Sequence, residues 1–148
     1  MMAEKKVVPL AVPDIGDDEI EEIKKVMGTG FLTEGATTKE FEQMVADYLG
    51  VKHAIAVTSC TTGLHAVLHC LDIKGQEVIV PDYTYPATAE AVVLAGGIPV
   101  LSDVDLDSMN MTTEILEEAY DEKMTVFSPV SWAGVPLEKE IYQKAKKL

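Results

Sequence analysis

A run of small polar residues, Ser59-Cys60-Thr61-Thr62-Gly63, lies between an apolar stretch and a helical pattern. The first backbone N–H groups of a helix have no partner within the helix, and the helix dipole favours an anion beside them. Small side chains let a phosphate approach these amides, and the hydroxyls of Ser59, Thr61 and Thr62 add hydrogen-bond donors. The run has neither the glycine spacing of a Walker loop nor that of a dinucleotide fingerprint. Phosphate binding and ordinary Ser/Thr capping of a helix are therefore both open interpretations.

Two tyrosines, Tyr83 and Tyr85, directly follow a predicted strand, within residues 81–88. Open α/β sheets bind their ligands beyond the carboxyl ends of the strands. These tyrosines either contact a ligand or simply cover the rim of the sheet, and the pattern alone leaves both interpretations open.

Two other kinds of chemistry have weaker support. Cys60 at a helix start has the setting of a reactive thiol, but the helix carries its nearest histidines, His65 and His69, away from the sulfur. His65, His69 and Asp72 share one helix face and could hold a metal, although a solvated polar face explains them more simply. We assign no catalytic residue and no metal ligand to this chain.

The elements that position these residues alternate regularly from residue 53 onward. Short apolar runs predict strands at 53–58, 77–80, 98–102 and 124–130, and helices are predicted at 61–71, 84–94, 112–120 and from 137 to 148. This alternation predicts an α/β fold with a doubly wound, mostly parallel sheet between two helical layers (αβα), joined by right-handed crossovers.

The first 50 residues have a different pattern. We expect an extended arm at 7–15, a helix capped by Asp17 and Asp18, a glycine-containing loop at 28–35, and a second helix that ends at Gly50. Residues 37–40, Thr-Thr-Lys-Glu, predict a capping box for this second helix.

The composition excludes several classes of protein. The 148 residues carry a formal charge of −13 and no arginine, which argues against binding to nucleic acid or to anionic lipid. No apolar run is long enough to span a bilayer, and the first residues do not resemble a secretory signal. Two cysteines make no disulfide framework, so we expect a cytoplasmic protein.

Six motifs, in order along residues 15–148, resemble those of the DegT/DnrJ/EryC1/StrS family, the pyridoxal-phosphate-dependent sugar aminotransferases. Residues 59–65, Ser-Cys-Thr-Thr-Gly-Leu-His, are similar to the family's Ser-Gly-Thr-Ala-Ala-Leu-His. Ser131 stands where a histidine is common in the family. The other matching segments are 30–35 with 40–42, 75–81, 84–88, 97–100 with 103–105, and 130–136.

The resemblance implies part of the large domain of a fold-type-I enzyme and a site for pyridoxal phosphate. It implies that the backbone amides of Thr61 and Thr62 hold the cofactor phosphate, with Ser59 and Cys60 in the same turn. It also implies that Tyr85 stacks on the pyridine ring.

Family members are dimers with shared sites, so the resemblance implies that residues 1–35 pack on a partner subunit. Thr33 and Gly35 would thereby reach the substrate. The implied substrates are glutamate and a nucleotide-linked keto sugar, in polysaccharide biosynthesis. Dehydratases of the same family are an alternative that these residues do not separate from aminotransferases.

Family members are more than twice as long as this chain. The family's Schiff-base lysine and the aspartate that pairs with the pyridinium nitrogen would follow Leu148, and none of the 12 lysines matches that lysine. We therefore expect the chain to be inactive alone and its cofactor site to be weak or incomplete. It is either part of a homodimeric enzyme, an inactive fragment, or one half of a split enzyme that needs a complementing C-terminal chain.

Overall fold

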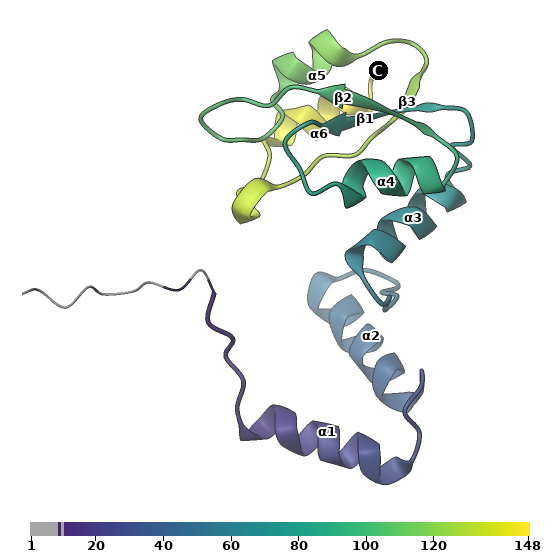
Figure 1. The fold of residues 1–148 in the computed structure, drawn as a ribbon, viewed down its shortest axis with the longest axis vertical. Coiled ribbons are helices and arrows are strands. Elements are labelled where there is room, and N and C mark those ends of the chain that lie inside the picture. The colour runs from purple at the N-terminus through teal and green to yellow at the C-terminus, as the bar shows by residue number, and fades with distance from the viewer. Residues whose placement is uncertain (1–8, 10) are drawn as a thin grey trace, which may run out of the picture. The chain divides into compact units, whose positions relative to one another are not determined.

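The structure is a computed structural model that describes residue 9 and residues 11–148 (Figure 1). The chain divides into two units, one up to Ala56 and one from Val57 to Leu148, and each is described here by itself. The expected arm at 7–15 lies partly outside the described residues, and residues 11–16 have no regular secondary structure. The packing of residues 1–35 on a partner stays a prediction.

The first unit holds α1 (Asp17–Thr29) and α2 (Ala36–Leu49), and each helix is capped differently from the prediction. Gly16 is the N-cap of α1, and its N–H donates to the Glu19 carboxylate over 2.7 Å, which lowers the pKa of Glu19. Asp17 and Asp18 lie already inside the helix, so the prediction that they cap it was wrong.

The N-terminal end of α2 also differs from the prediction. Gly35, whose backbone is extended, is the N-cap, and no side chain caps the helix. The predicted capping box at 37–40 was wrong because the helix begins at Ala36, which places both threonines within its first turn. Both helices end at a glycine in the left-handed conformation, Gly30 and Gly50. The end at Gly50 was predicted, whereas α1 continues to Thr29, into the loop expected at 28–35.

The second unit contains a parallel sheet of three strands in the order β2-β1-β3. The strands are β1 (Glu77–Pro81), β2 (Ile98–Ser102) and β3 (Met124–Phe127). Ile79 at the centre of β1 pairs with Val100 of β2 and with Phe127 of β3. The helices are α3 (Cys60–Cys70), α4 (Ala87–Leu94), α5 (Thr113–Ala119) and α6 (Lys139–Ala145), with a short 3-10 turn, η1 (Trp132–Gly134).

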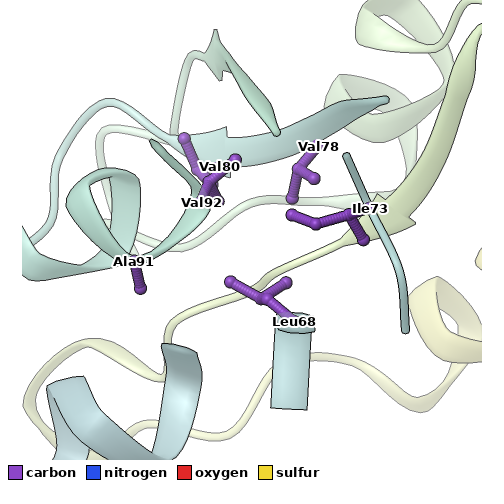
Figure 2. Packing of buried hydrophobic residues seen from close by; sticks show 6 residues of the cluster. All are labelled: Leu68, Ile73, Val78, Val80, Ala91 and Val92. Atoms are coloured by element: carbon purple, nitrogen blue, oxygen red, sulfur yellow. The ribbon is translucent and has the colours of Figure 1, made fainter. Parts of the chain in front are cut away.

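The side chains of β1 alternate between two buried clusters, one on each face of the sheet. Val78 and Val80 pack with residues of α3, α4 and the turn between α3 and β1, as Figure 2 shows. Ile79 points the other way, to a cluster that includes Leu116 of α5 and Ile141 of α6. The predicted three-layer αβα arrangement with a parallel sheet is therefore confirmed for this unit (Figure 1).

One predicted strand is absent. Residues 53–58 form no strand, and Ile55 and Val57 are largely exposed. A strand needs a neighbouring strand to pair with, and the sheet of the described residues pairs only β1, β2 and β3. In this stretch the Ala56 N–H donates to the Glu42 carboxylate, over 2.8 Å, instead of to a neighbouring strand.

The other elements occur where predicted, but most are shorter. Helix α4 begins at Ala87 rather than at residue 84, because the segment before it forms the turn that leaves β1. Helix α6 spans Lys139–Ala145 rather than 137–148. Strand β3 ends at Phe127, although the Ser128 N–H still donates to the Ile79 carbonyl over 2.9 Å.

Candidate functional site

The helices α3 and α4 begin at the same end of the sheet. The Gly75 N–H in the turn after α3 donates to the Gly96 carbonyl in the turn after α4, over 2.8 Å, so the C-terminal ends of the two helices lie together. Both helices pack on the same face of the sheet. Because α4 starts directly after β1, the N-terminal ends of both helices point to the carboxyl end of β1, where α/β sheets bind ligands.

The start of α3 is a compact cluster of hydroxyl groups. Ser59 has extended backbone, and its Oγ accepts a hydrogen bond from the Thr62 N–H over 3.1 Å. The Thr62 Oγ1 lies 2.9 Å from the Ser59 Oγ and 3.3 Å from the Thr58 Oγ1. Ser59 is thus a side-chain N-cap, which fixes the first turn of the helix.

The cap determines which amides stay available to an anion. The Thr62 N–H is used by Ser59, and the Gly63 N–H donates to the Ser59 carbonyl over 3.1 Å. Within the part of the chain that the structure describes, no hydrogen bond occupies the N–H groups of Cys60 and Thr61. In this conformation the amides of Cys60 and Thr61 are unpaired at the positive end of the helix dipole, and the role of the Thr61 and Thr62 amides in phosphate binding stays a prediction.

The segment between β1 and α4 presents the two tyrosines. The Asp82 N–H donates to the Ser102 carbonyl over 2.9 Å, which extends the pairing of β1 with β2 by one residue. The Thr84 and buried Thr88 hydroxyls lie 2.9 Å apart and hold the turn that enters α4. Tyr85 is 78% exposed, so its ring is free to contact a ligand within this unit.

A third segment, which was not predicted to belong to the site, reaches this end of the sheet from β3. Trp132 lies against Tyr83, with ring centroids 4.4 Å apart and planes tilted by 42°. Asn110, from the loop between β2 and α5, bonds to the backbone on both sides of this turn. The sequence did contain a signal for this segment. Trp132 is the only tryptophan in the sequence, it follows β3 by five residues, and it lies in the matched segment 130–136.

Thr33 and Gly35 lie in the first unit, in the loop between α1 and α2. They line a hollow together with Phe31 and Leu32, whose side chains are mostly exposed. Thr33 and Gly35 belong to the first unit, whereas Ser59–Thr62 and Tyr85 belong to the second. Their role in substrate binding stays a prediction.

The described residues show no arrangement that favours the alternative thiol or metal chemistry. The rings of His65 and His69 lie edge to face, 6.3 Å apart. Among residues 9 and 11–148, no three His, Cys, Asp or Glu side chains are grouped to hold a metal. Cys60 is exposed, and no hydrogen bond in the described part of the chain joins it to a histidine. None of the described helices is long and apolar enough to cross a membrane.

Comparison with known structures identifies the fold. A protein from Streptococcus pneumoniae named as a sugar aminotransferase, solved in PLP, PMP and apo forms, is 33% identical, with a TM-score of 0.87. An aminotransferase from Psychrobacter cryohalolentis is 30% identical, with a TM-score of 0.86. These matches cover 95% and 94% of this chain and 36% of each neighbour.

A third similar structure is that of a dehydratase rather than an aminotransferase. It is the E. coli GDP-4-keto-6-deoxy-D-mannose-3-dehydratase with bound hydrated PLP, which is 26% identical, with a TM-score of 0.87. The match covers 94% of this chain and 38% of the dehydratase. The chain thus spans little more than a third of the length of the structures it matches. The model of the DegT/DnrJ/EryC1/StrS aminotransferase family matches residues 13–146, and the chain belongs to this family.

Proposed function

We propose that this chain supplies the phosphate-binding turn and the ring-stacking residue of a pyridoxal phosphate site in a sugar aminotransferase. The observation that carries the proposal is the start of α3, where two unpaired amides lie beside three hydroxyls. A phosphate needs such donors, and small side chains leave room for it. The S. pneumoniae neighbour has a PLP form and the dehydratase has bound PLP, which supports this cofactor.

The residues present fit the cofactor. The amides of Cys60 and Thr61 and the hydroxyls of Ser59 and Thr62 would hold its phosphate, and the exposed ring of Tyr85 would cover the face of its pyridine ring. When bound, pyridoxal phosphate supplies the electron sink that amino-group transfer requires. The residues named here bind and orient the cofactor and transfer no proton.

The substrates follow from the family. We propose glutamate as amino donor and a nucleotide-linked keto sugar as acceptor, in cytoplasmic polysaccharide biosynthesis, with Thr33 and Gly35 on the substrate side. The dehydratase neighbour acts on a GDP-linked keto sugar, which supports the sugar class but leaves the dehydratase reaction as an alternative.

The first unit supports a partner for the chain. Only Ala46 is buried among its described residues, while α1 and α2 expose apolar side chains. These are Ile20, Ile23, Met27, Phe41, Met44 and Leu49. Apolar faces of this extent favour burial against another chain. We propose a second copy of the chain as the partner. A complementing C-terminal chain, or an inactive fragment with no partner, are the alternatives that the oligomeric state tests.

Binding of pyridoxamine phosphate, measured by calorimetry, tests the cofactor site. This probe has no aldehyde, so it does not react with the lysines, and pyridoxamine is the matched ligand without phosphate. We expect pyridoxamine phosphate to bind at least about tenfold more tightly, since hydrogen bonds to a charged group each contribute about 1.5–3 kcal/mol. Equal affinities for the two ligands would contradict the phosphate site.

A pair of variants separates the cap from the phosphate site. Ser59→Ala and Thr112→Ala each remove an N-cap hydroxyl, Ser59 from α3 and Thr112 from α5. Both should lower stability by about 0.5–2 kcal/mol. Only Ser59→Ala should weaken pyridoxamine phosphate binding, and a loss of equal size in Thr112→Ala would mean that the effect comes from stability alone.

A further inference from the structure

We propose that Asn110 is a positioning residue for the aromatic side of the candidate site. Its side chain fixes the turn that carries Trp132, Trp132 supports Tyr83, and Tyr83 in turn fixes the segment that presents Tyr85. The part of this proposal that concerns the cofactor rests on the proposed function, whereas the positioning of Trp132 does not.

The Asn110 side chain is buried and uses both ends of its amide. Its Nδ2 donates to the Val135 carbonyl over 3.1 Å, and its Oδ1 accepts from the Trp132 N–H over 2.8 Å. Asn110 is only 4% exposed, so water cannot replace these partners easily. A buried amide that loses its partners bears the full cost of desolvation, which makes this pair of bonds specific.

The two bonds bracket a turn of unfavourable backbone. Between Trp132 and Val135, Ala133 has φ 50° and Gly134 has φ 80°, both in the left-handed region. An L-residue with a Cβ such as Ala133 is disfavoured there. Such a conformation persists where its surroundings determine it, and here the amide of Asn110 holds the backbone on either side.

Asn110 is itself held in place by the preceding turn. The Asp105 N–H donates to the Asn110 carbonyl over 2.9 Å, and the Asn110 N–H donates to the Ser108 Oγ over 3.3 Å. Ser108 in turn donates twice to the Asp105 carboxylate, from its N–H and from its Oγ, each over 2.8 Å. The next residue, Met111, is buried in the second core cluster. The amide therefore projects from a well-anchored segment.

The turn held by Asn110 is connected to the candidate site through the rings of Trp132 and Tyr83. Trp132 is 36% exposed and Tyr83 is 47% exposed, so each covers part of the other while one side stays open. Tyr83 precedes Tyr85 by two residues in the segment that leaves β1. If the turn at 132–134 relaxes, Tyr83 loses the ring against which it packs, and the position of Tyr85 becomes less defined.

Trp132 is the only tryptophan in the sequence, so its fluorescence reports on this turn directly. Asn110→Leu keeps the approximate shape of the side chain and removes both bonds, whereas Thr112→Ala removes the N-cap of α5 two residues later and leaves both bonds in place. We expect Asn110→Leu to shift the emission of Trp132 to longer wavelength and to raise its quenching by acrylamide. Tyr83→Leu should do the same, and Thr112→Ala should not. Circular dichroism confirms that each variant is folded.

Unchanged emission and quenching in folded Asn110→Leu would overturn the proposal. If that variant does not fold, hydrogen exchange in the unaltered protein decides instead. A slowly exchanging Trp132 N–H supports the bond to Asn110, and exchange as fast as in an unfolded chain overturns it.

Binding of pyridoxamine phosphate separates the proposal from the proposed function. We expect Asn110→Leu to weaken this binding about tenfold, the equivalent of ordering one aromatic side chain on binding. If the emission changes but the unaltered protein binds no pyridoxamine phosphate, the positioning role stands and the proposed function fails. If the emission changes while binding stays as in the unaltered protein, Asn110 positions Trp132 without affecting the cofactor, and that part of the proposal is refuted.

Discussion

Gly97, directly before β2, provides the sharpest test of the packing that holds the sheet. A Cβ at this position would lie 2.6 Å from the Ile73 Cδ1 and 3.0 Å from the Val92 Cγ1. Carbon atoms in contact prefer about 3.5–4.0 Å, so the first contact overlaps by about 1 Å. Ile73 is 1% exposed and Val92 0%, so neither has room to move aside. Gly97→Ala therefore forces the first core cluster to expand.

The expected cost follows from two opposing effects. Overpacking of a well-packed core costs about 1–3 kcal/mol. The backbone of Gly97 is outside the left-handed region, so alanine also gains about 0.4–1 kcal/mol from a less flexible unfolded chain. We expect a net loss of about 1–2 kcal/mol, which in a unit of this size lowers Tm by about 5–15 °C.

A second substitution identifies the cause. Ile73→Val removes the Cδ1 atom that the new Cβ would meet, and alone it should cost about 0.5–1.5 kcal/mol. In the double variant the costs should be less than additive by about 1 kcal/mol, because the closer of the two contacts no longer exists. Urea unfolding followed by Trp132 fluorescence measures all three variants. Additive costs, or a Gly97→Ala variant as stable as the unaltered chain, would refute the reasoning.

Three further predictions concern other parts of the second unit. Gly63→Ala should raise the stability of this unit by about 0.5–1 kcal/mol, as measured by urea unfolding, because alanine is the better helix former. The one close contact of the new Cβ, 3.3 Å to the Val57 Cγ2, involves an exposed side chain that can move. The two hydrogen bonds from Ser108 lower the pKa of Asp105, so they stabilise the fold above the ordinary carboxyl range, and this stabilisation is lost as pH falls through the lowered pKa. NMR titration should therefore show a higher Asp105 pKa in Ser108→Ala. Ile141→Ala should cost about 2–5 kcal/mol in thermal unfolding, because this side chain is fully buried between α6 and the sheet.

The sequence predicted the sheet well wherever the chain contains both strands of a pair. The apolar runs that became β1, β2 and β3 are short, and their pattern is local. Residues 53–58 have the same pattern, but they form no strand because pairing depends on a neighbour that no local pattern specifies. Ile55 is a residue type typical of strands, but its side chain is 80% exposed instead of being packed in a sheet.

The helix starts differ from the predicted ones by one to three residues. In α1, Asp17 is a good N-cap by type, but the Glu19 carboxylate reaches back to the Gly16 N–H and makes glycine the cap. For the start of α3, the sequence left both Ser/Thr capping and phosphate binding open. The structure shows that Ser59 caps the helix, and this does not exclude an anion at the same turn. Capping and anion binding use different amides of the same turn, so the two interpretations are compatible.

The two parts of the candidate site differ in the same way: one is formed by local contacts and the other by contacts between residues far apart in the sequence. The turn at 59–62 is formed by hydrogen bonds between residues three or four positions apart, so its residue types alone were enough to identify it. The aromatic side depends on Asn110, whose bonds to Trp132 and Val135 span 22 and 25 residues. No sequence periodicity connects these positions, which is why Trp132 was known only as a motif member. It also follows that the two sides of the site are independent. Damage to the cap at Ser59 should leave the tryptophan turn intact, and loss of the Asn110 amide should leave the amides of α3 where they are.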